Sequence, residues 1–175
     1  MSIKIQFQEK VRFEFDWEDK LDNLFNSSKS DLKKQLQLLN SINSRYNDVS
    51  ALGRDKSPEM QKTVKAKMEK LMKVREQVIE SLKEHCMHIE NRYKGKELSE
   101  IELHDLVNSF VFHYALEEPL FAHVDNVDQA IYNLKEGDIH HERMCEFVEQ
   151  KLKGFGVAKS MHEIKELIRA SKCII

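Results

Sequence analysis

Apolar and polar residues alternate along the first seventeen residues of the chain. The apolar side chains occupy odd positions, with Glu9 as the exception. This two-residue period is typical of a half-buried β-strand. A bend around residues 8–10 makes a hairpin with one apolar face, but a three-residue loop without glycine is not a favoured hairpin turn, so one long strand is the alternative. The predicted β element covers residues 1–17, and its apolar face consists of Ile3, Ile5, Phe7, Val11, Phe13, Phe15 and Trp17.

The period of the apolar positions becomes helical from Ser30 onward. A first stripe ends near Gly53, a residue type that commonly terminates helices. A second follows Ser57 and Pro58, which form a strong helix start, and meets no helix breaker before Gly95. This second helix is expected to span about 35 residues, or about 50 Å. The stripes are Leu32, Leu36, Leu39, Ile42 and Tyr46 in the first helix, and Val64, Met68, Leu71, Val78, Leu82, Cys86, Ile89 and Tyr93 in the second.

Four shorter helices are expected after the long one. The most apolar of them contains LVNSFVFHYAL, whose two apolar sides are typical of a helix buried between neighbours. The predicted fold class is therefore mainly α: a single domain over residues 1–175, in which a bundle of about six helices over residues 30–172 carries the N-terminal β element. The local signals that delimit the last helices are the capping boxes Ser99–Glu102 and Ser160–Glu163, the N-cap Asp138, and the breakers Pro119, Gly137 and Gly154.

The composition is that of a globular helical protein. Of 175 residues, 41% are hydrophobic and 33% are charged, which is too apolar for a disordered chain. Five glycines and two prolines are few and favour long helices with short connections. A formal net charge of −2 excludes a strong overall field toward nucleic acid or an anionic membrane, and no apolar run approaches the roughly 20 residues of a membrane span.

The cysteines bear on the cellular compartment. Cys86, Cys145 and Cys173 show no close pairing, and the chain begins without a secretory signal. Reduced thiols and a cytoplasmic location are therefore expected.

Histidines and carboxylates supply one candidate metal site. His113 and Glu117 are four residues apart, hence on one side of the most apolar helix. His140 and His141 are expected to point inward from a first helical turn, where the helix dipole disfavours the protonated ring. These four residues are candidate ligands for iron or zinc, as in bundles that hold dinuclear iron between their helices. The other interpretation is that His113 and Glu117 simply pair with each other, or that Glu117 is exposed at the helix end, and then no cofactor is expected.

Lysines supply the candidate nucleic-acid site. Lys62, Lys65 and Lys73 share the outer face of the long helix with Glu69 and Glu76. Such mixed charge is typical of a solvated helix face, and no aromatic residues are interleaved for base stacking. Nucleic-acid binding is therefore the weaker alternative.

Catalytic signatures are missing from the sequence. It contains no glycine-rich phosphate loop, G-x-S-x-G, C-x-x-C or H-E-x-x-H pattern. Enzymatic activity is therefore the minority expectation, although a Cys–His pair that meets only in the fold is open.

These observations predict a binding or regulatory role. The chain is expected to act as a cytoplasmic helical module through protein–protein contacts, as a homo-oligomer, because the long helix exceeds what a compact bundle needs. The N-terminal apolar face also requires a cover, which a second copy would provide. A metal-binding bundle that acts as a sensor or oxidase is the first alternative, and a nucleic-acid-binding accessory protein is the second. The residues expected at the interface are Ile5, Phe7, Phe13, Phe15 and Trp17.

Overall fold

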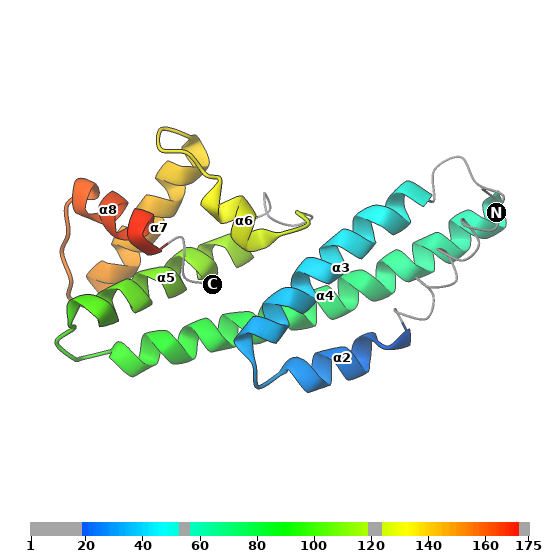
Figure 1. Cartoon of the computed structure of the whole chain (residues 1–175), viewed down its shortest axis with the longest axis horizontal. Coiled ribbons are helices and arrows are strands. Elements are labelled where there is room, and N and C mark those ends of the chain that lie inside the picture. Colours follow the sequence, from blue (N-terminus) through cyan, green and yellow to red (C-terminus); the bar gives the residue numbers. More distant parts are fainter. Residues whose placement is uncertain (1–18, 53–56, 119–123, 172–175) are drawn as a thin grey trace. The chain divides into compact units, whose positions relative to one another are not determined.

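The part of the chain that the structure describes consists of helices and their connections (Figure 1). The computed structural model describes residues 19–52, 57–118 and 124–171. The mainly α fold class is confirmed, whereas the β element predicted over residues 1–17 lies outside the described residues. The helices in this part are α2 (Leu21–Ser28), α3 (Leu32–Leu52), α4 (Pro58–Tyr93), α5 (Glu100–Glu117), α6 (Val127–Tyr132), α7 (Ile139–Gly154) and α8 (Met161–Ser171).

The long helix predicted after Ser57 is α4, which has 36 residues. Ser57 caps it, because its Oγ accepts a hydrogen bond from the backbone N–H of Met60 at 3.3 Å. Beyond its end Gly95 adopts a φ of 76°, a left-handed conformation that glycine takes without steric cost. The long helix is thus delimited by the local signals that predicted it.

The later helices also begin at their predicted caps. The Ser99 Oγ accepts from the Glu102 N–H at 3.3 Å and donates to its carboxylate at 2.9 Å. Ser160 makes the same two contacts with Glu163, at 3.2 and 3.1 Å. At the other end of α5, Glu118 is extended, with φ −83° and ψ 122°, as steric contact with a following proline requires.

The helix α2 was missed by the sequence pattern. It has eight residues, LDNLFNSS, and its asparagines and serines are poor helix formers. Contacts made elsewhere hold it: Leu21 is fully buried, and the Asp22 carboxylate lies 2.9 Å from the Lys70 ammonium on α4. Its stability is therefore tertiary in origin, and its eight residues are too few for a helical period to stand out in the sequence.

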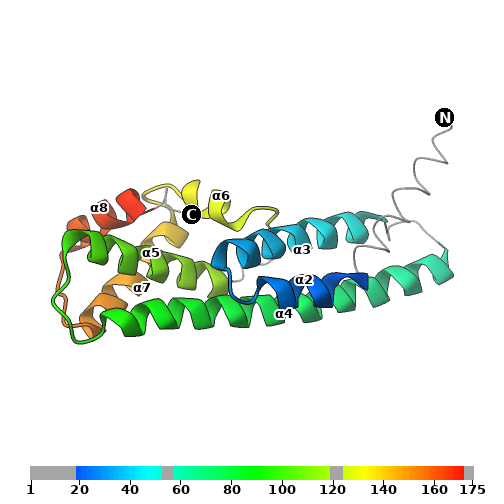
Figure 2. The same ribbon diagram turned by 60° about the horizontal axis from the view of Figure 1, so that its bottom comes forward.

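The chain divides into two compact units, Met1–Leu82 and Lys83–Ile175, here called the N-terminal and C-terminal units. In the N-terminal unit α3 runs along the first part of α4 in the opposite direction, and α2 packs on α3 (Figures 1 and 2). The prediction of one domain over the whole chain stays a prediction. The core of this unit contains Leu21, Leu36, Leu39, Ile42, Val49, Leu71, Val74, Val78 and Leu82.

The C-terminal unit is built on α5. This helix packs on both α7 and α8, which also pack on each other, and the segment of α4 from Lys83 to Tyr93 runs antiparallel to it. Ser109 donates to the Cys86 carbonyl at 3.3 Å, and the Tyr93 hydroxyl donates to Asp105 at 2.7 Å. The prediction that α5 is covered on two sides is confirmed, because its buried residues are Leu106, Val107, Ser109, Phe110, Val111, Phe112, His113, Tyr114 and Ala115.

Among the described residues, no helix has both the length and the apolar composition needed to cross a membrane.

Candidate functional site

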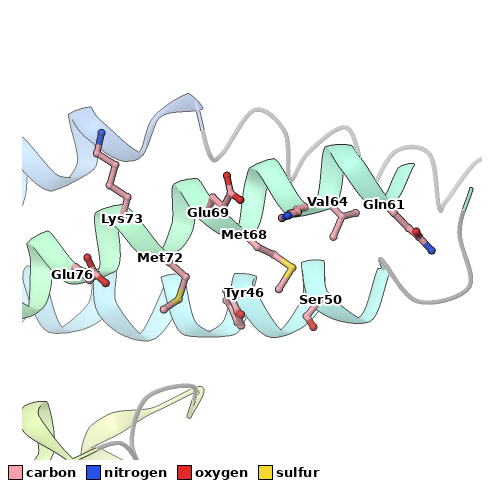
Figure 3. Close-up of a pocket in the computed structure, with 10 residues that line it drawn as sticks. Tyr46, Ser50, Gln61, Val64, Met68, Glu69, Met72, Lys73 and Glu76 are labelled. Carbon is pink, nitrogen blue, oxygen red and sulfur yellow. The ribbon is translucent and has the colours of Figure 1, made fainter. Parts of the chain in front are cut away.

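An open groove of about 650 Å³ runs along α4 beside α3 in the N-terminal unit. Figure 3 shows Val64, Met68 and Met72 pointing from α4 to the side where α3 carries Tyr46 and Ser50. The sequence placed Tyr46 and Met68 in core stripes, but both are only half-buried. We call this surface the methionine groove and define it by its walls, which are formed by Tyr46, Ser50, Gln61, Val64, Met68 and Met72.

The groove stays open because α3 covers a neighbouring face of α4. The core contacts of α4 are made by Leu71 and Val78, which are fully buried. At about 100° per residue, Met72 lies about 100° from Leu71 around the helix axis, at the edge of the face that α3 covers. Lys70, which pairs with α2, lies nearly opposite Met68. The methionine groove and α2 therefore lie on different sides of α4.

Two polar contacts join α3 to α4. The Arg75 Nε donates to the Asn43 Oδ1 at 2.8 Å, and the Gln35 amide donates to the Ser81 hydroxyl at 2.6 Å. Burial lowers the pKa of Arg75, although Glu76 raises it. Gln35 and Asn43 are fully buried, and buried polar pairs of this kind specify a single register between helices. This register places Tyr46 opposite the two methionines.

The rim of the groove on α4 is charged. Lys65, Glu69, Lys73 and Glu76 line it, and all four are exposed. Lys62, the third lysine of the predicted nucleic-acid site, is exposed on the same helix. Glu69 separates Lys65 from Lys73 and Glu76 follows Lys73, so the three predicted lysines do not form one continuous basic patch. The nucleic-acid hypothesis stays a prediction that this arrangement does not favour.

The predicted pair of His113 and Glu117 is present in the C-terminal unit with an additional partner. The His113 ring lies between two carboxylates, with Nδ1 3.1 Å from Glu90 and Nε2 3.1 Å from Glu117. Glu90 is buried, whereas the Glu117 side chain is 48% exposed and lies 3.9 Å from the Lys83 ammonium. Carboxylates only accept, so both contacts are hydrogen bonds only when two protons are shared among the three groups. Pairing accounts for these side chains without a metal ion.

The other two predicted ligands lie on α7. His141 is buried, as predicted, and its Nδ1 lies 3.6 Å from the Cys145 sulfur. His140 is half-buried, and the α7 side chain whose ring meets that of His113 is Phe147, at a centroid distance of 5.7 Å. Within the described ranges, no three His, Cys, Asp or Glu side chains are arranged to hold a metal ion. The iron or zinc hypothesis stays a prediction.

Cysteine nucleophiles find no support in the part of the chain that is described. Cys86 and Cys145 are both buried and form no disulfide. Burial raises the pKa of the Cys86 thiol to about 11, against a smaller lowering by Ser109. A nucleophilic cysteine needs a thiolate that solvent can reach, and both of these side chains are buried.

The raised pKa of Cys86 makes the protein less stable at alkaline pH. The folded state favours the thiol, so this contribution is complete below the unfolded pKa, near 9, and is lost as the pH rises toward 11. Between these limits we expect the wild type to lose about 2–3 kcal/mol more of its free energy of unfolding than Cys86→Ala does. Urea unfolding of both proteins across this range measures the difference. Parallel pH profiles would contradict the expectation.

Two features of the structure were not predicted from the sequence: the groove along α4 and the contact of the Glu90 carboxylate with His113. Met68 was assigned to the core stripe although it is half-buried, and Met72, which is also half-buried, was assigned to no surface. Glu90 follows Cys86 by four residues and hence shares its inward side. The predicted interface residues Ile5, Phe7, Phe13, Phe15 and Trp17 lie outside the described residues.

Comparison of the chain with protein-family models, curated proteins and solved structures gives no match.

Proposed function

We propose that this protein is a binding module that acts through protein–protein contacts, and that its binding surface is the methionine groove. The observation that carries the proposal is the open apolar surface of this groove. Its walls include Val64, Met68, Met72 and Tyr46, and charges of both signs lie along its rim. Methionine side chains are flexible and adapt to the shape of a partner. An apolar centre with a polar rim is the usual composition of a protein interface.

The shape of the groove suits a helix more closely than a small molecule. Gln61 and Glu76 mark its ends on α4, which corresponds to about 22 Å or four helical turns. Pockets for small molecules enclose most of their ligand, whereas this surface is open along its length. The proposed ligand is therefore an amphipathic helix whose apolar residues recur every three or four positions, with charges of both signs beside them.

The test places a photoreactive benzoylphenylalanine at position 72 of the full chain, within its native cell. The control carries the same group at Gln77, which is exposed on the same helix and is not part of the groove. We expect a protein adduct from position 72 and none from position 77. Mass spectrometry identifies the cross-linked partner, which is then produced in pure form.

Titration with the purified partner completes the test. Met72→Asp is expected to weaken binding at least about ten-fold, because it places a charge in the apolar centre of the contact, and Gln77→Asp is expected to leave binding unchanged. Equal adducts from both positions, or an unchanged affinity for Met72→Asp, would remove the groove as the binding surface. The regulatory role and the cytoplasmic location stay predictions from the sequence.

A further inference from the structure

We infer that the partner of the methionine groove is a second copy of this chain, bound antiparallel about a two-fold axis. The inference rests on the proposed function and identifies its ligand. It is drawn from six exposed residues that lie beside the groove on one face of α4. At about 100° per residue they fall within an arc of about 80°. We call them the charged stripe: Lys62, Lys65, Glu69, Lys73, Glu76 and Glu80.

The order of signs along the charged stripe is self-complementary. From the N-terminal end it reads positive, positive, negative, positive, negative, negative. Reading it backwards and inverting each sign returns the same series. Successive residues of the stripe are three or four positions apart, and this series of spacings read backwards agrees with itself to within one position. In an antiparallel dimer each charge of the stripe therefore faces an opposite charge of the second copy.

The register of the pairing follows from these positions. Lys62 lies level with the partner's Glu80, Lys65 with the partner's Glu76, and Glu69 with the partner's Lys73. A two-fold axis generates each contact twice, as in an isologous interface. The paired segment of α4 is about 27 Å long. In the same register Met68 lies within about half a turn of the partner's Met72, so the apolar walls meet beside the charges.

The charge pattern also favours a second copy of this chain over other protein partners. The charged stripe has three residues of each sign, so it exerts no net field that would select a strongly acidic or basic protein. Like charges facing each other across an interface are strongly unfavourable. In a stripe of mixed charge without this order, some like charges would face each other in an antiparallel dimer. In the charged stripe of this protein, every facing pair has opposite signs.

Reciprocal charge reversal tests the inference. One variant carries Lys65→Glu and Lys73→Glu, and the other carries Glu69→Lys and Glu76→Lys. Sedimentation velocity of the full-length protein at micromolar concentrations is expected to show a dimer for the wild type. Each variant alone is expected to self-associate about ten-fold or more weakly, whereas an equimolar mixture regains dimers because every contact again joins opposite signs. Lys33→Glu with Lys34→Glu, exposed on α3, is the charge-matched control and should remain dimeric.

A cross-link supplies independent evidence for the register. A carbodiimide joins a lysine amine directly to a carboxylate. Lys65 and Glu76 of one chain are eleven residues apart in a continuous helix, or about 16 Å, which is too far for a direct amide. A Lys65–Glu76 link in the wild-type protein therefore reports two chains, and a mixture of ¹⁴N- and ¹⁵N-labelled protein shows the link to be intermolecular.

The outcomes separate this inference from the proposed function. If the wild type is monomeric and position 72 is cross-linked to a different protein, the partner is not a second copy, but the methionine groove is still the binding surface. A wild-type dimer that survives the reversals but is lost in Phe13→Asp with Phe15→Asp would overturn the inference and assign self-association to the N-terminal segment. Dimers restored only in the mixture, together with the Lys65–Glu76 link, would establish it.

Discussion

Replacing Phe110 by alanine is expected to lower the free energy of unfolding of the C-terminal unit by about 3–5 kcal/mol. Phe110 is fully buried at the centre of α5, and its ring packs edge-on against Phe155, with centroids 5.7 Å apart and planes at 61°. The substitution removes both the buried apolar area and an aromatic contact, and it leaves a cavity that close-packed neighbours fill only in part.

Urea unfolding followed by circular dichroism measures this loss, and hydrogen exchange of the α5 amides assigns it to the C-terminal unit. Ile101→Ala is the matched control, because Ile101 lies on the same helix and is 82% exposed. It should change the free energy of unfolding by less than about 0.5 kcal/mol. Equal effects of the two substitutions would show that α5 is not the centre of this core.

Removal of His113 is the second change with a large expected effect. In His113→Leu the buried Glu90 carboxylate loses the imidazole that lies 3.1 Å away. An uncompensated buried charge costs about 3–5 kcal/mol, and we expect a loss of this size in the urea experiment. Glu117 adds little to it, because its half-exposed carboxylate is solvated without the ring.

The double variant His113→Leu with Glu90→Leu distinguishes lost pairing from lost packing. When both partners are apolar no charge is stranded, so the double variant should recover most of the stability that His113→Leu loses. His104→Leu, a half-buried histidine on the same helix, is the control and should stay within about 0.5 kcal/mol of the wild type. A double variant as unstable as His113→Leu would mean that the ring acts through its packing on Phe147.

In the cluster around His113, only the contact within one helix could be predicted from the sequence. Four-residue spacing on one helix brought His113 and Glu117 together, and the structure confirms that they interact. Glu90 belongs to another helix, so its contact with His113 depended on how α4 and α5 pack. His140 and His141 share the inward side of α7 only in part, since one is half-buried and the other buried.

Helix limits were predictable because the interactions that set them are local. Ser57, Ser99, Asp138 and Ser160 satisfy backbone N–H groups within three residues of themselves, and such contacts can be identified in a sequence without a fold. The helix α2 escaped prediction for the opposite reason. Its support comes from the burial of Leu21 and from Lys70 on α4, 48 residues away from Asp22.

By itself, the sequence determined that this protein is mainly helical, where α4, α5, α7 and α8 begin, and which charges follow one another along α4. Those properties depend on residues within one or two turns of each other. Only the tertiary structure decided that α3 covers the Leu71 side of α4 and leaves the Met72 side open, and that Glu90 meets His113. Helix packing selects one face among several of similar apolar character, and that choice depends on contacts between residues far apart in the chain.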